Sequence, residues 1–364
     1  MSVVKERVEL GSRSYEIWIG AGALEKAGAL IARSGKRTLV VTNRRVERLH
    51  GGRLYESLEK VSVQWRKIIL PEGEEHKNMA SVARVHDALI RGGYDRGCVV
   101  TGFGGGVTGD IAGFAAATYM RGVKVAQIPT TLLAQVDSSV GGKTGVNHPV
   151  GKNMIGSFHQ PCLVVADISA LTTLPRVEVL CGVAEVIKYG AIASAGFFSF
   201  LERNMEQLLR MEPKVVERAV RTSCKIKAQV VEKDELEAGR RAILNFGHTV
   251  GHSIEAVTGY KTFKHGHAVA IGMSVAATLS WMKGGLAKKD EERITRLIRQ
   301  AGLPAVIPAG LSTKSLLKAM ESDKKVKAGK IRFALLSGIG ESGIRDDVTL
   351  GEIREAIELN RLST

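Results

Sequence analysis

The chain has 364 residues, of which 44% are apolar and 5% aromatic, and its 52 Lys and Arg against 37 Asp and Glu give a formal net charge of +15. This length predicts two domains, and the apolar content is enough for a buried core. The basic residues are dispersed and the aromatic residues are too few for a base-stacking platform, so the charge favours small anionic ligands over nucleic acid.

The cysteines and the N-terminus bear on the cellular compartment. The four cysteines lie far apart in apolar segments, without a CxxC pair: Cys98, Cys162, Cys181 and Cys224. This pattern predicts buried thiols in a reducing compartment and argues against a disulfide framework or a thiolate zinc site. The N-terminus lacks the apolar region of a signal peptide, and no run of about 18 apolar residues could span a bilayer. We therefore expect a soluble, cytoplasmic protein.

The N-terminal half alternates between apolar strands and amphipathic helices. Two alternating segments, 3–9 and 14–19, predict an opening hairpin. The spacing that follows is typical of a parallel sheet covered by helices on both faces, so we expect an α/β, Rossmann-like domain with a mostly parallel sheet. The expected strands are 36–43, 61–70, 97–103, 124–130 and 162–167, and the expected helices are 44–60, 79–94 and one that ends at Met120.

The alternation of strands and helices changes after about residue 133. Residues 134–160 are rich in Gly, Ser and Asn and are expected to form a long loop. Beyond about residue 176 amphipathic helices dominate, which predicts an all-α C-terminal domain. We place the boundary in 171–178, giving domains 1–176 and 177–364. A basic turn at Lys324 and Lys325 precedes one late expected strand, and by itself such a charge cluster is typical of solvent-facing surface.

A glycine run follows the expected strand 97–103. Gly104, Gly106 and Gly109 match GxGxxG in a strand–turn–helix context, which favours a phosphate or nucleotide site at the helix N-terminus. The run departs from the usual dinucleotide motif because it lies late in the domain and because no acid follows at the usual distance for the ribose. Glycine-rich turns also arise for packing alone.

The expected loop 134–160 carries polar residues suited to an anionic ligand. Lys143 and Lys152 would suit phosphate or carboxylate groups, and Asp137, Asn153 and His159 lie in the same segment. Loops of this length inside a compact domain are usually functional or disordered, and the apolar flanks argue against disorder. The alternative is that both lysines belong to ordinary surface.

Four of the nine histidines lie in 243–267. His248 and His252 are spaced to share one face of a buried helix, and His265 and His267 open a second apolar helix. Neutral imidazole is the commonest metal ligand, so imidazoles at the ends of neighbouring helices suggest a metal site. The alternative is one or two hydrogen-bonded core histidines.

An acid and a lysine share a face of an otherwise apolar helix over 181–192. Glu185 and Lys188 are spaced as a structural ion pair, or else Glu185 joins His248 and His265 as a metal ligand. Two histidines and a carboxylate with an open position form a catalytic zinc pattern. Asn245 is expected on the same helix face as His248, and Arg241 is expected to face the same cavity.

Together these motifs resemble the 3-dehydroquinate synthase family, within the sugar-phosphate cyclase superfamily. The resemblance covers nearly the whole chain. It implies an α/β N-terminal domain, a helical C-terminal domain, tightly bound NAD, a divalent Zn²⁺ or Co²⁺ ion and a homodimer. The matching motifs are, in order, PEGEEHK, GGGVTGD, YMRG, IPTTLLAQVDSSVGGKTGVN, GKNMIGSF, AEVIKYG, LNFGHTVGHSIE, HGHAVAIGM and DKKVKAGKIRF.

The resemblance also implies roles for individual residues. The implied metal ligands are Glu185, His248 and His265. The implied NAD-binding residues are Glu72, Gly73, Glu74, Glu75, His76, Lys77, Gly106, Val107, Thr108, Gly109, Asp110, Thr130, Thr131, Lys143, Lys152, Ala170, Leu171, Thr172 and Thr173. The implied substrate-binding and catalytic residues are Asp137, Lys152, Lys188, Lys227, Arg241, Asn245, His252, Lys324 as one of the DKK lysines, and Arg121, which would reach into a partner subunit's site.

The implied reaction is the cyclising step of the shikimate pathway, which leads to aromatic amino acids. Its substrate, 3-deoxy-D-arabino-heptulosonate 7-phosphate, is a phosphorylated sugar acid. NAD⁺ would oxidise C5, phosphate would leave by β-elimination, the hydride would return, and an intramolecular aldol step would give 3-dehydroquinate. His252 and Lys152 are candidates for proton relay near C5. In the motif HGHAVA, His267 stands where the family most often has Glu, and it has no assigned role.

Three rival functions remain open. A sister cyclase of the 2-deoxy-scyllo-inosose or valiolone type would share the NAD and metal motifs, although Lys152, Arg241 and the DKK lysines favour a carboxylate-bearing substrate. A metal-dependent polyol dehydrogenase would share the two-domain plan but produce net NADH. A basic nucleic-acid-binding module conflicts with the dispersed charge and the scarce aromatic residues.

Overall fold

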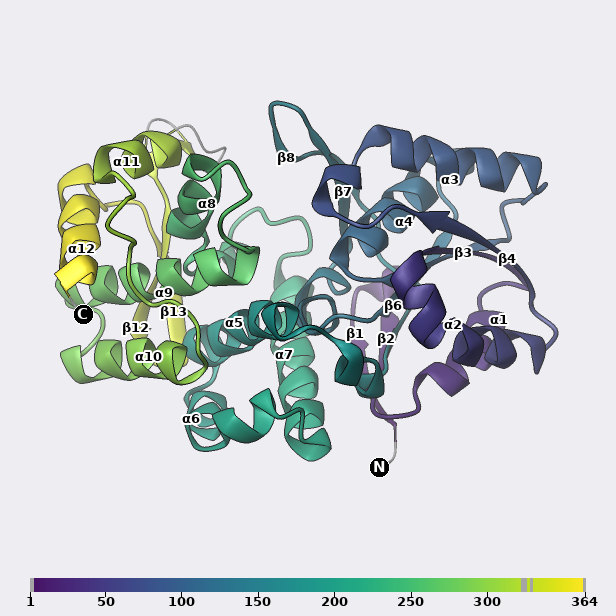
Figure 1. Cartoon of the computed structure of the whole chain (residues 1–364), viewed down its shortest axis with the longest axis horizontal. Coiled ribbons are helices and arrows are strands. Elements are labelled where there is room, and N and C mark those ends of the chain that lie inside the picture. Colours follow the sequence, from purple (N-terminus) through teal and green to yellow (C-terminus); the bar gives the residue numbers. More distant parts are fainter. Residues whose placement is uncertain (1–2, 322–325, 328–329, 363–364) are drawn as a thin grey trace. The chain divides into compact units, whose positions relative to one another are not determined.

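The structure, a computed structural model, describes residues 3–321, 326–327 and 330–362. The chain packs into two compact units (Figure 1). The first unit comprises Met1–Pro175 and Met211–Glu232, and the second comprises Arg176–Arg210 and Lys233–Thr364. Within the described residues, no helix is both long and apolar enough to cross a membrane.

A seven-stranded sheet forms the centre of the first unit, with strand order β1-β2-β9-β6-β5-β3-β4. The β1–β2 hairpin is antiparallel, as expected, and every other neighbouring pair is parallel. The predicted α/β fold with a mostly parallel sheet is therefore confirmed. The strands are β1 (Val4–Val8), β2 (Tyr15–Ile19), β3 (Arg37–Asn43), β4 (Gln64–Leu70), β5 (Val99–Gly104), β6 (Lys124–Pro129) and β9 (Leu163–Ala166).

Helices cover both faces of this sheet. Successive side chains of each strand point to opposite faces, so the apolar strands present two apolar faces that the helices bury. In β3, Leu39 and Val41 pack into one apolar core with Val85 and Ile111, whereas Val40 packs into the other core. The first core includes residues of α3 (Met79–Arg91) and α4 (Gly106–Thr118), and the second includes residues of α1 (Ala27–Ala32) and α2 (Arg44–Glu59).

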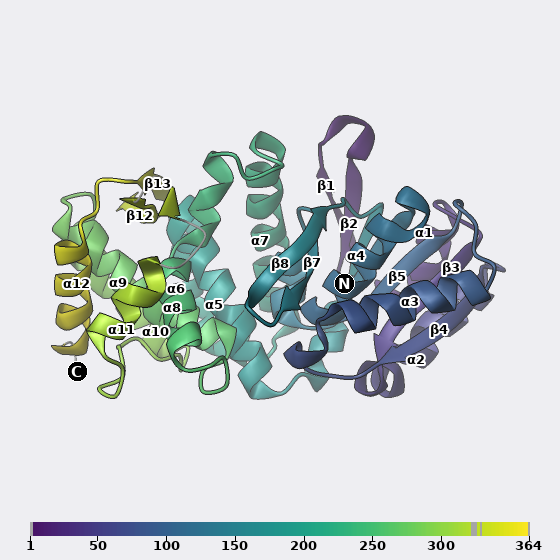
Figure 2. The same cartoon turned by 90° about the horizontal axis from the view of Figure 1, so that it is seen from above.

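The expectation of a long loop at 134–160 is wrong. A π-helical turn (Ala134–Ser138) leads into an antiparallel hairpin of β7 (Lys143–His148) and β8 (Gly151–Phe158), which run side by side in Figure 2. The glycines that suggested a loop permit the close pairing. A Cβ on Gly156 would lie 2.3 Å from the Thr144 carbonyl oxygen, and one on Gly145 would lie 2.6 Å from that of Ile155.

Helix α7 (Pro213–Lys233) belongs to the first unit except for its last residue, whereas the predicted domain 177–364 includes all of it. Its Cys224 thiol donates a hydrogen bond to the Gln135 carbonyl oxygen at 3.2 Å, and Lys227 also bonds to the π-helical turn. The helical periodicity of α7 is satisfied by either core, so it does not identify the unit that the helix joins.

Helices dominate the second unit, as predicted. Helix α9 is almost entirely buried and contacts α5, α8, α10 and α12. Two short antiparallel hairpins are also present. The helices are α5 (Arg176–Ala193), α6 (Ala195–Leu209), α8 (His248–Val257), α9 (His265–Met282), α10 (Lys288–Gln300), α11 (Thr313–Glu321) and α12 (Leu350–Leu362), and the strands are β10 (Val326–Lys327), β11 (Lys330–Ile331), β12 (Phe333–Gly338) and β13 (Glu341–Arg345).

Candidate active site

The second unit brings together Glu185 of α5, His248 at the start of α8 and His265 at the start of α9. Glu185 Oε1 lies 3.5 Å from His248 Nε2 and 3.9 Å from His265 Nε2. One potential ligand atom from each residue lies within 4.8 Å of the others. Two imidazoles and a carboxylate at these distances could hold a divalent metal ion and leave a position for a further ligand.

The second nitrogen of each imidazole has an acceptor of its own. His248 Nδ1 lies 3.2 Å from the Phe246 carbonyl oxygen, and His265 Nδ1 lies 3.1 Å from Glu255 Oε2. An Nδ1–H that donates to these acceptors leaves Nε2 unprotonated and directed at Glu185. Carboxylate–histidine pairs of this kind orient metal ligands. Glu255 was not among the predicted site residues, although its spacing places it on the helix face of His248 and His252.

Glu185 is completely buried, and Lys188 Nζ forms an ion pair with its Oε2. Among the described residues, no donor forms a hydrogen bond with Oε1, which is the atom that both imidazoles approach. A buried carboxylate is costly unless charges and hydrogen bonds compensate it. The residues therefore fit a cation placed between Oε1 and the two Nε2 atoms, and both interpretations of Glu185, as ion-pair partner and as ligand, agree with the geometry.

A close helix crossing sets the positions of the two histidines. Gly247 precedes α8 with a φ of +79°, in the left-handed region that favours glycine. A Cβ on Gly272 of α9 would lie 1.9 Å from the Gly247 carbonyl oxygen, so only glycine allows the two backbones to approach so closely. The start of α8 is therefore held directly against α9.

The expectation that Asn245 shares a helix face with His248 is wrong. Asn245 ends a 3-10 helix, η7 (Arg240–Asn245), and Phe246 and Gly247 separate that helix from α8. The left-handed conformation at Gly247 breaks the helical periodicity on which the expectation rested. Asn245 Nδ2 instead donates to Glu237 Oε1 at 3.3 Å.

Of the other predicted residues of the second unit, His252 lies beside the candidate metal ligands. The His252 ring centroid is 5.5 Å from that of His248 and 6.0 Å from that of His265. Lys188 and Arg241 are both buried, and Arg241 donates to the Glu235 carbonyl oxygen. Burial lowers the pKa of the half-buried His267, although the charge of Glu178 opposes this shift. Lys324 lies outside the described residues.

In the first unit, the glycine run forms the turn from β5 into α4. Gly105 caps α4 without a side chain, leaving the first amides of this helix open to an anion. A Cβ on Gly105 would lie 3.1 Å from Thr131 Cγ2, and one on Gly106 would lie 3.1 Å from Ser138 Oγ. The predicted segments 106–110 and 130–131 are thus adjacent.

This turn lies at a topological switch point of the sheet. The chain leaves β3 toward β4 on one side and leaves β5 toward β6 on the other. Ligands of open parallel sheets bind at the carboxyl ends of strands at such a point. A cavity of about 300 Å³ also opens beside the carboxyl end of β4 and is lined by Arg44, Glu72 and Arg84, among others.

Lys77 connects the predicted segment 72–77 to the start of α4. Its Nζ lies 2.5 Å from Asp110 Oδ2 and donates to Asn153 Oδ1 of β8 at 2.6 Å. Burial would lower the pKa of Lys77, but the negative charges of Asp110 and Glu74 outweigh this effect and raise it. Lys77 is therefore a charged, fixed cation next to the glycine turn.

The remaining predicted residues of the first unit lie on several elements. Lys227 Nζ of α7 donates to Asp137 Oδ1 at 2.6 Å and to the Asp137 carbonyl oxygen at 2.7 Å. Lys143 and Lys152 lie on the two strands of the β7–β8 hairpin. Arg121 is exposed, with a φ of +68°. Residues 170–173 lie in the 3-10 helix η6 (Ile168–Thr173) that follows β9.

Comparisons with known proteins cover nearly the whole chain. Residues 67–181 match the family model "3-dehydroquinate synthase N-terminal", and residues 182–326 match "3-dehydroquinate synthase C-terminal". A curated 3-dehydroquinate synthase of Desulforamulus reducens is 48% identical over 95% of this chain and 97% of its own length.

Two solved structures of related cyclases share the fold. A 2-deoxy-scyllo-inosose synthase in complex with carbaglucose-6-phosphate, NAD⁺ and Co²⁺ has a TM-score of 0.89 at 26% identity, covering 98% of this chain and 100% of the other. A 2-epi-5-epi-valiolone synthase of Streptomyces hygroscopicus with NAD⁺ and Zn²⁺ has a TM-score of 0.89 at 28% identity, covering 100% and 99%.

Proposed function

Because this chain belongs to the 3-dehydroquinate synthase family, we propose that it converts 3-deoxy-D-arabino-heptulosonate 7-phosphate to 3-dehydroquinate and phosphate, as a carbon–oxygen lyase. The near-full-length likeness to a curated 3-dehydroquinate synthase carries this proposal, because the likeness to the sister cyclases is much weaker in sequence. The donor set Glu185, His248 and His265 is the structural observation that supports it.

We infer that the second unit holds Zn²⁺ or Co²⁺ through Glu185, His248 and His265, and that the first unit binds NAD at the glycine turn of β5 and α4. When bound, the metal supplies a Lewis acid and NAD a reversible hydride acceptor. The open amides of α4 and the charged Lys77 would hold the pyrophosphate of NAD. The remaining NAD-binding residues are those predicted from the sequence.

The substrate carries a carboxylate and a phosphate, and this chain offers buried cations for both. In the second unit, Lys188 and Arg241 would bind anionic or hydroxyl groups of the substrate, and His252 beside the metal ligands would move a proton. In the first unit, Lys227 holds Asp137 in one orientation, and Lys152 is a further candidate for binding and proton relay. The proposed roles of Asn245 and Arg121 rest on the family resemblance.

The test of this function is phosphate release from the heptulosonate phosphate, with and without a metal chelator. Wild-type protein should release phosphate only with metal present, and His248→Ala should fall below about 1% of its rate because a ligand is lost. His86→Ala serves as a control, since His86 lies in α3 of the first unit and bonds to Thr118 and Ala115. Full activity of His248→Ala without bound metal would contradict the assignment of His248 as a ligand of a catalytic metal.

Two further measurements separate the rival functions. A polyol dehydrogenase accumulates NADH at 340 nm during turnover, whereas the proposed reaction returns its hydride and leaves the absorbance constant. A sister cyclase of the 2-deoxy-scyllo-inosose type would instead use glucose 6-phosphate, of which carbaglucose-6-phosphate is a carbocyclic analogue. Release of phosphate from glucose 6-phosphate and none from the heptulosonate phosphate would replace our proposal with that function.

We also propose that the protein acts as a homodimer in the cytoplasm, in which Arg121 reaches a partner subunit's site. The chain mass is 39.1 kDa, so light scattering should give a mass of about twice that value. Arg121→Ala should then lose activity without losing NAD or metal binding.

A further inference from the structure

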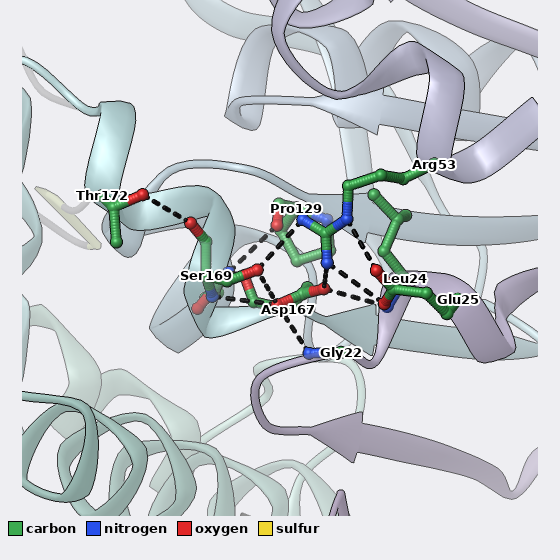
Figure 3. A network of polar contacts seen from close by, with 9 residues as sticks. Gly22, Leu24, Glu25, Arg53, Pro129, Asp167, Ser169 and Thr172 are labelled. Carbon is green, nitrogen blue, oxygen red and sulfur yellow. Dashed lines mark hydrogen bonds and ion pairs between the residues drawn. The ribbon is translucent and has the colours of Figure 1, made fainter.

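Asp167 is a buried carboxylate that follows β9 and caps η6, and it is 2% exposed. Figure 3 shows donors from three segments converging on it. Ser169 donates its amide at 2.9 Å and its hydroxyl at 2.7 Å to Oδ1. The Gly22 amide reaches the same oxygen at 3.3 Å, and the Leu24 amide reaches Oδ2 at 3.1 Å. These bonds compensate the cost of burying the charge.

Arg53 of α2 provides the charge partner. Its Nη2 lies 2.6 Å from Asp167 Oδ2, and its Nη1 donates to Ser169 Oγ at 3.0 Å (Figure 3). The same guanidinium binds Glu25 through Nε at 2.7 Å and through Nη2 at 3.1 Å. The Arg53 guanidinium therefore connects α2 to η6 and to the segment before α1.

The cluster of Asp167, Arg53, Ser169 and Glu25 holds segments that carry predicted site residues. Residues 170–173 of η6, which we propose to bind NAD, follow directly after Asp167 and Ser169. The Asp167 carbonyl oxygen accepts from Gln135 Nε2 at 2.9 Å, and Gln135 lies in the π-helical turn that carries Asp137. A second contact from α2 reaches the end of η6, where His50 Nε2 lies 3.0 Å from Thr173 Oγ1.

We propose that Asp167 and Arg53 are positioning residues for NAD: they hold η6 in the conformation that presents residues 170–173 to the cofactor. The alternative is that the cluster only stabilises the fold, as many partly buried ion pairs do. The geometry favours a positioning role because Asp167 accepts from the Ser169 amide and Arg53 donates to the Ser169 hydroxyl, and Ser169 is part of η6 itself. This inference rests on the proposed binding of NAD by the first unit.

The second unit offers a matched control. Arg293 of α10 is as exposed as Arg53, at 35% against 33%, and it likewise forms a fork with one glutamate, Glu202, and contacts an aspartate, Asp290. Arg293→Ala therefore removes an equivalent arginine from the other unit. Glu25→Gln is a second control, because it removes a partner of Arg53 and keeps Asp167.

The experiment compares purified wild type with Arg53→Ala, Arg53→Lys, Glu25→Gln and Arg293→Ala. NAD affinity is measured by calorimetric titration, metal affinity by competition with a chelator, and order in η6 by hydrogen exchange of peptides spanning 168–173. Arg53→Ala should weaken NAD binding about tenfold or more and speed exchange in 168–173, with unchanged metal affinity. Arg53→Lys should recover part of the NAD affinity. Glu25→Gln and Arg293→Ala should stay within about twofold of wild type.

The outcomes separate this inference from the proposed function. If wild type binds NAD and Arg53→Ala binds it within about twofold of wild type, the positioning role is overturned. It is also overturned if Arg53→Ala and Arg293→Ala lose the same amount of NAD affinity. Equal loss of NAD and metal affinity would mean a general loss of stability and would also overturn it. Wild-type protein that binds no NAD would overturn both proposals, and phosphate release measured on the same preparation would show whether the reaction itself survives.

Discussion

At the scale of single residues, each of the three candidate metal ligands in the second unit also has a partner that orients it. His248 is oriented by a backbone carbonyl, His265 by Glu255 and Glu185 by Lys188. Glu255 is itself buried, at 3% exposure, and its carboxylate beside His265 Nδ1 favours the tautomer with the proton on Nδ1. Glu255 would thus determine which nitrogen of His265 is available to a metal ion at the proposed site.

Replacement of this carboxylate tests that role. We expect Glu255→Gln to lower zinc affinity about 10- to 100-fold, because an amide can present its N–H to Nδ1 and no longer stabilises the required tautomer. Competition with a fluorescent chelator measures the affinity. Glu178→Gln is the control, since Glu178 pairs with Lys264 at 3.1 Å and is 34% exposed. Equal affinity in Glu255→Gln and wild type would refute the orienting role.

At the scale of helices, the site depends on the α8–α9 crossing. The backbone contact between Gly247 and Gly272 leaves no space for a side chain, and His248 begins α8 directly after that contact. Packing that is this close transmits a displacement of one helix to the residues of the other.

The crossing gives a second prediction. Gly272→Ala should lower the melting temperature by several degrees and abolish metal binding, because its Cβ would overlap the Gly247 carbonyl oxygen and separate the helices. Thermal unfolding and metal titration measure the two effects. Gly196→Ala of α6, whose Cβ would meet nothing within 4 Å, should be neutral or slightly stabilising. Native metal affinity in Gly272→Ala would show that the crossing does not position His248.

The N-terminus of α12 is stabilised by a capping box. Glu352 Oε2 accepts from the Thr349 amide at 2.7 Å, and the Glu352 amide donates to Thr349 Oγ1 at 3.2 Å. The hydrogen bond from Lys283 to Glu352 is the largest cause that lowers the pKa of this carboxyl group to about 2, followed by those from Thr349. Because the pKa of Glu352 is lower in the folded protein than in the unfolded chain, the ionised carboxylate stabilises the fold at any pH above the unfolded-state pKa. This stabilisation is lost as the pH falls toward 2.

Stability measured against pH tests this box. At pH 7 we expect Glu352→Gln to lower the free energy of unfolding by about 1 kcal/mol, since the charged cap and the ion pair are both lost. The difference from wild type should shrink below about pH 4.5 and vanish near pH 2, where wild-type Glu352 is also protonated. Urea titrations at several pH values measure it. A difference that is constant with pH would contradict the assignment.

At the scale of the whole molecule, both units are built on cores that exclude water from polar groups and thiols. Cys98, Cys181 and Cys224 are buried and Cys162 is half-buried, and all are free thiols. Burial is the largest cause of the raised pKa of each thiol, to about 12 for Cys224 and about 11 for Cys98 and Cys181. These thiols are therefore protonated and shielded in the native protein.

Thiol reactivity then reports global unfolding. At pH 8 the native protein should react slowly with a thiol reagent, because the thiolate is the reactive form and little of it exists. All four cysteines should react rapidly in denaturant at the same pH. Absorbance of the released chromophore measures the rates. Fast labelling of the native protein at one thiol, mapped to Cys162 by mass spectrometry, would show that its partial exposure outweighs its raised pKa.

Local sequence determined much of this protein by itself. The strand–helix alternation of the first unit, the caps at Asn43 and Thr349 and the glycine turn before α4 follow from short-range periodicity and hydrogen bonding, which a window of neighbouring residues contains. The candidate metal ligands Glu185, His248 and His265 came from their residue types and from the family resemblance, because no fixed spacing links these three positions.

Only the tertiary structure decided the rest, because it depends on which backbones approach one another and which residues become buried. Packing assigned α7 to the first unit, turned a glycine-rich segment into the β7–β8 hairpin and broke the helix between Asn245 and His248. It also brought Glu255 to His265 and Arg53 to Asp167. Such contacts arise from backbone approach and burial, which the residue types involved do not reveal by themselves.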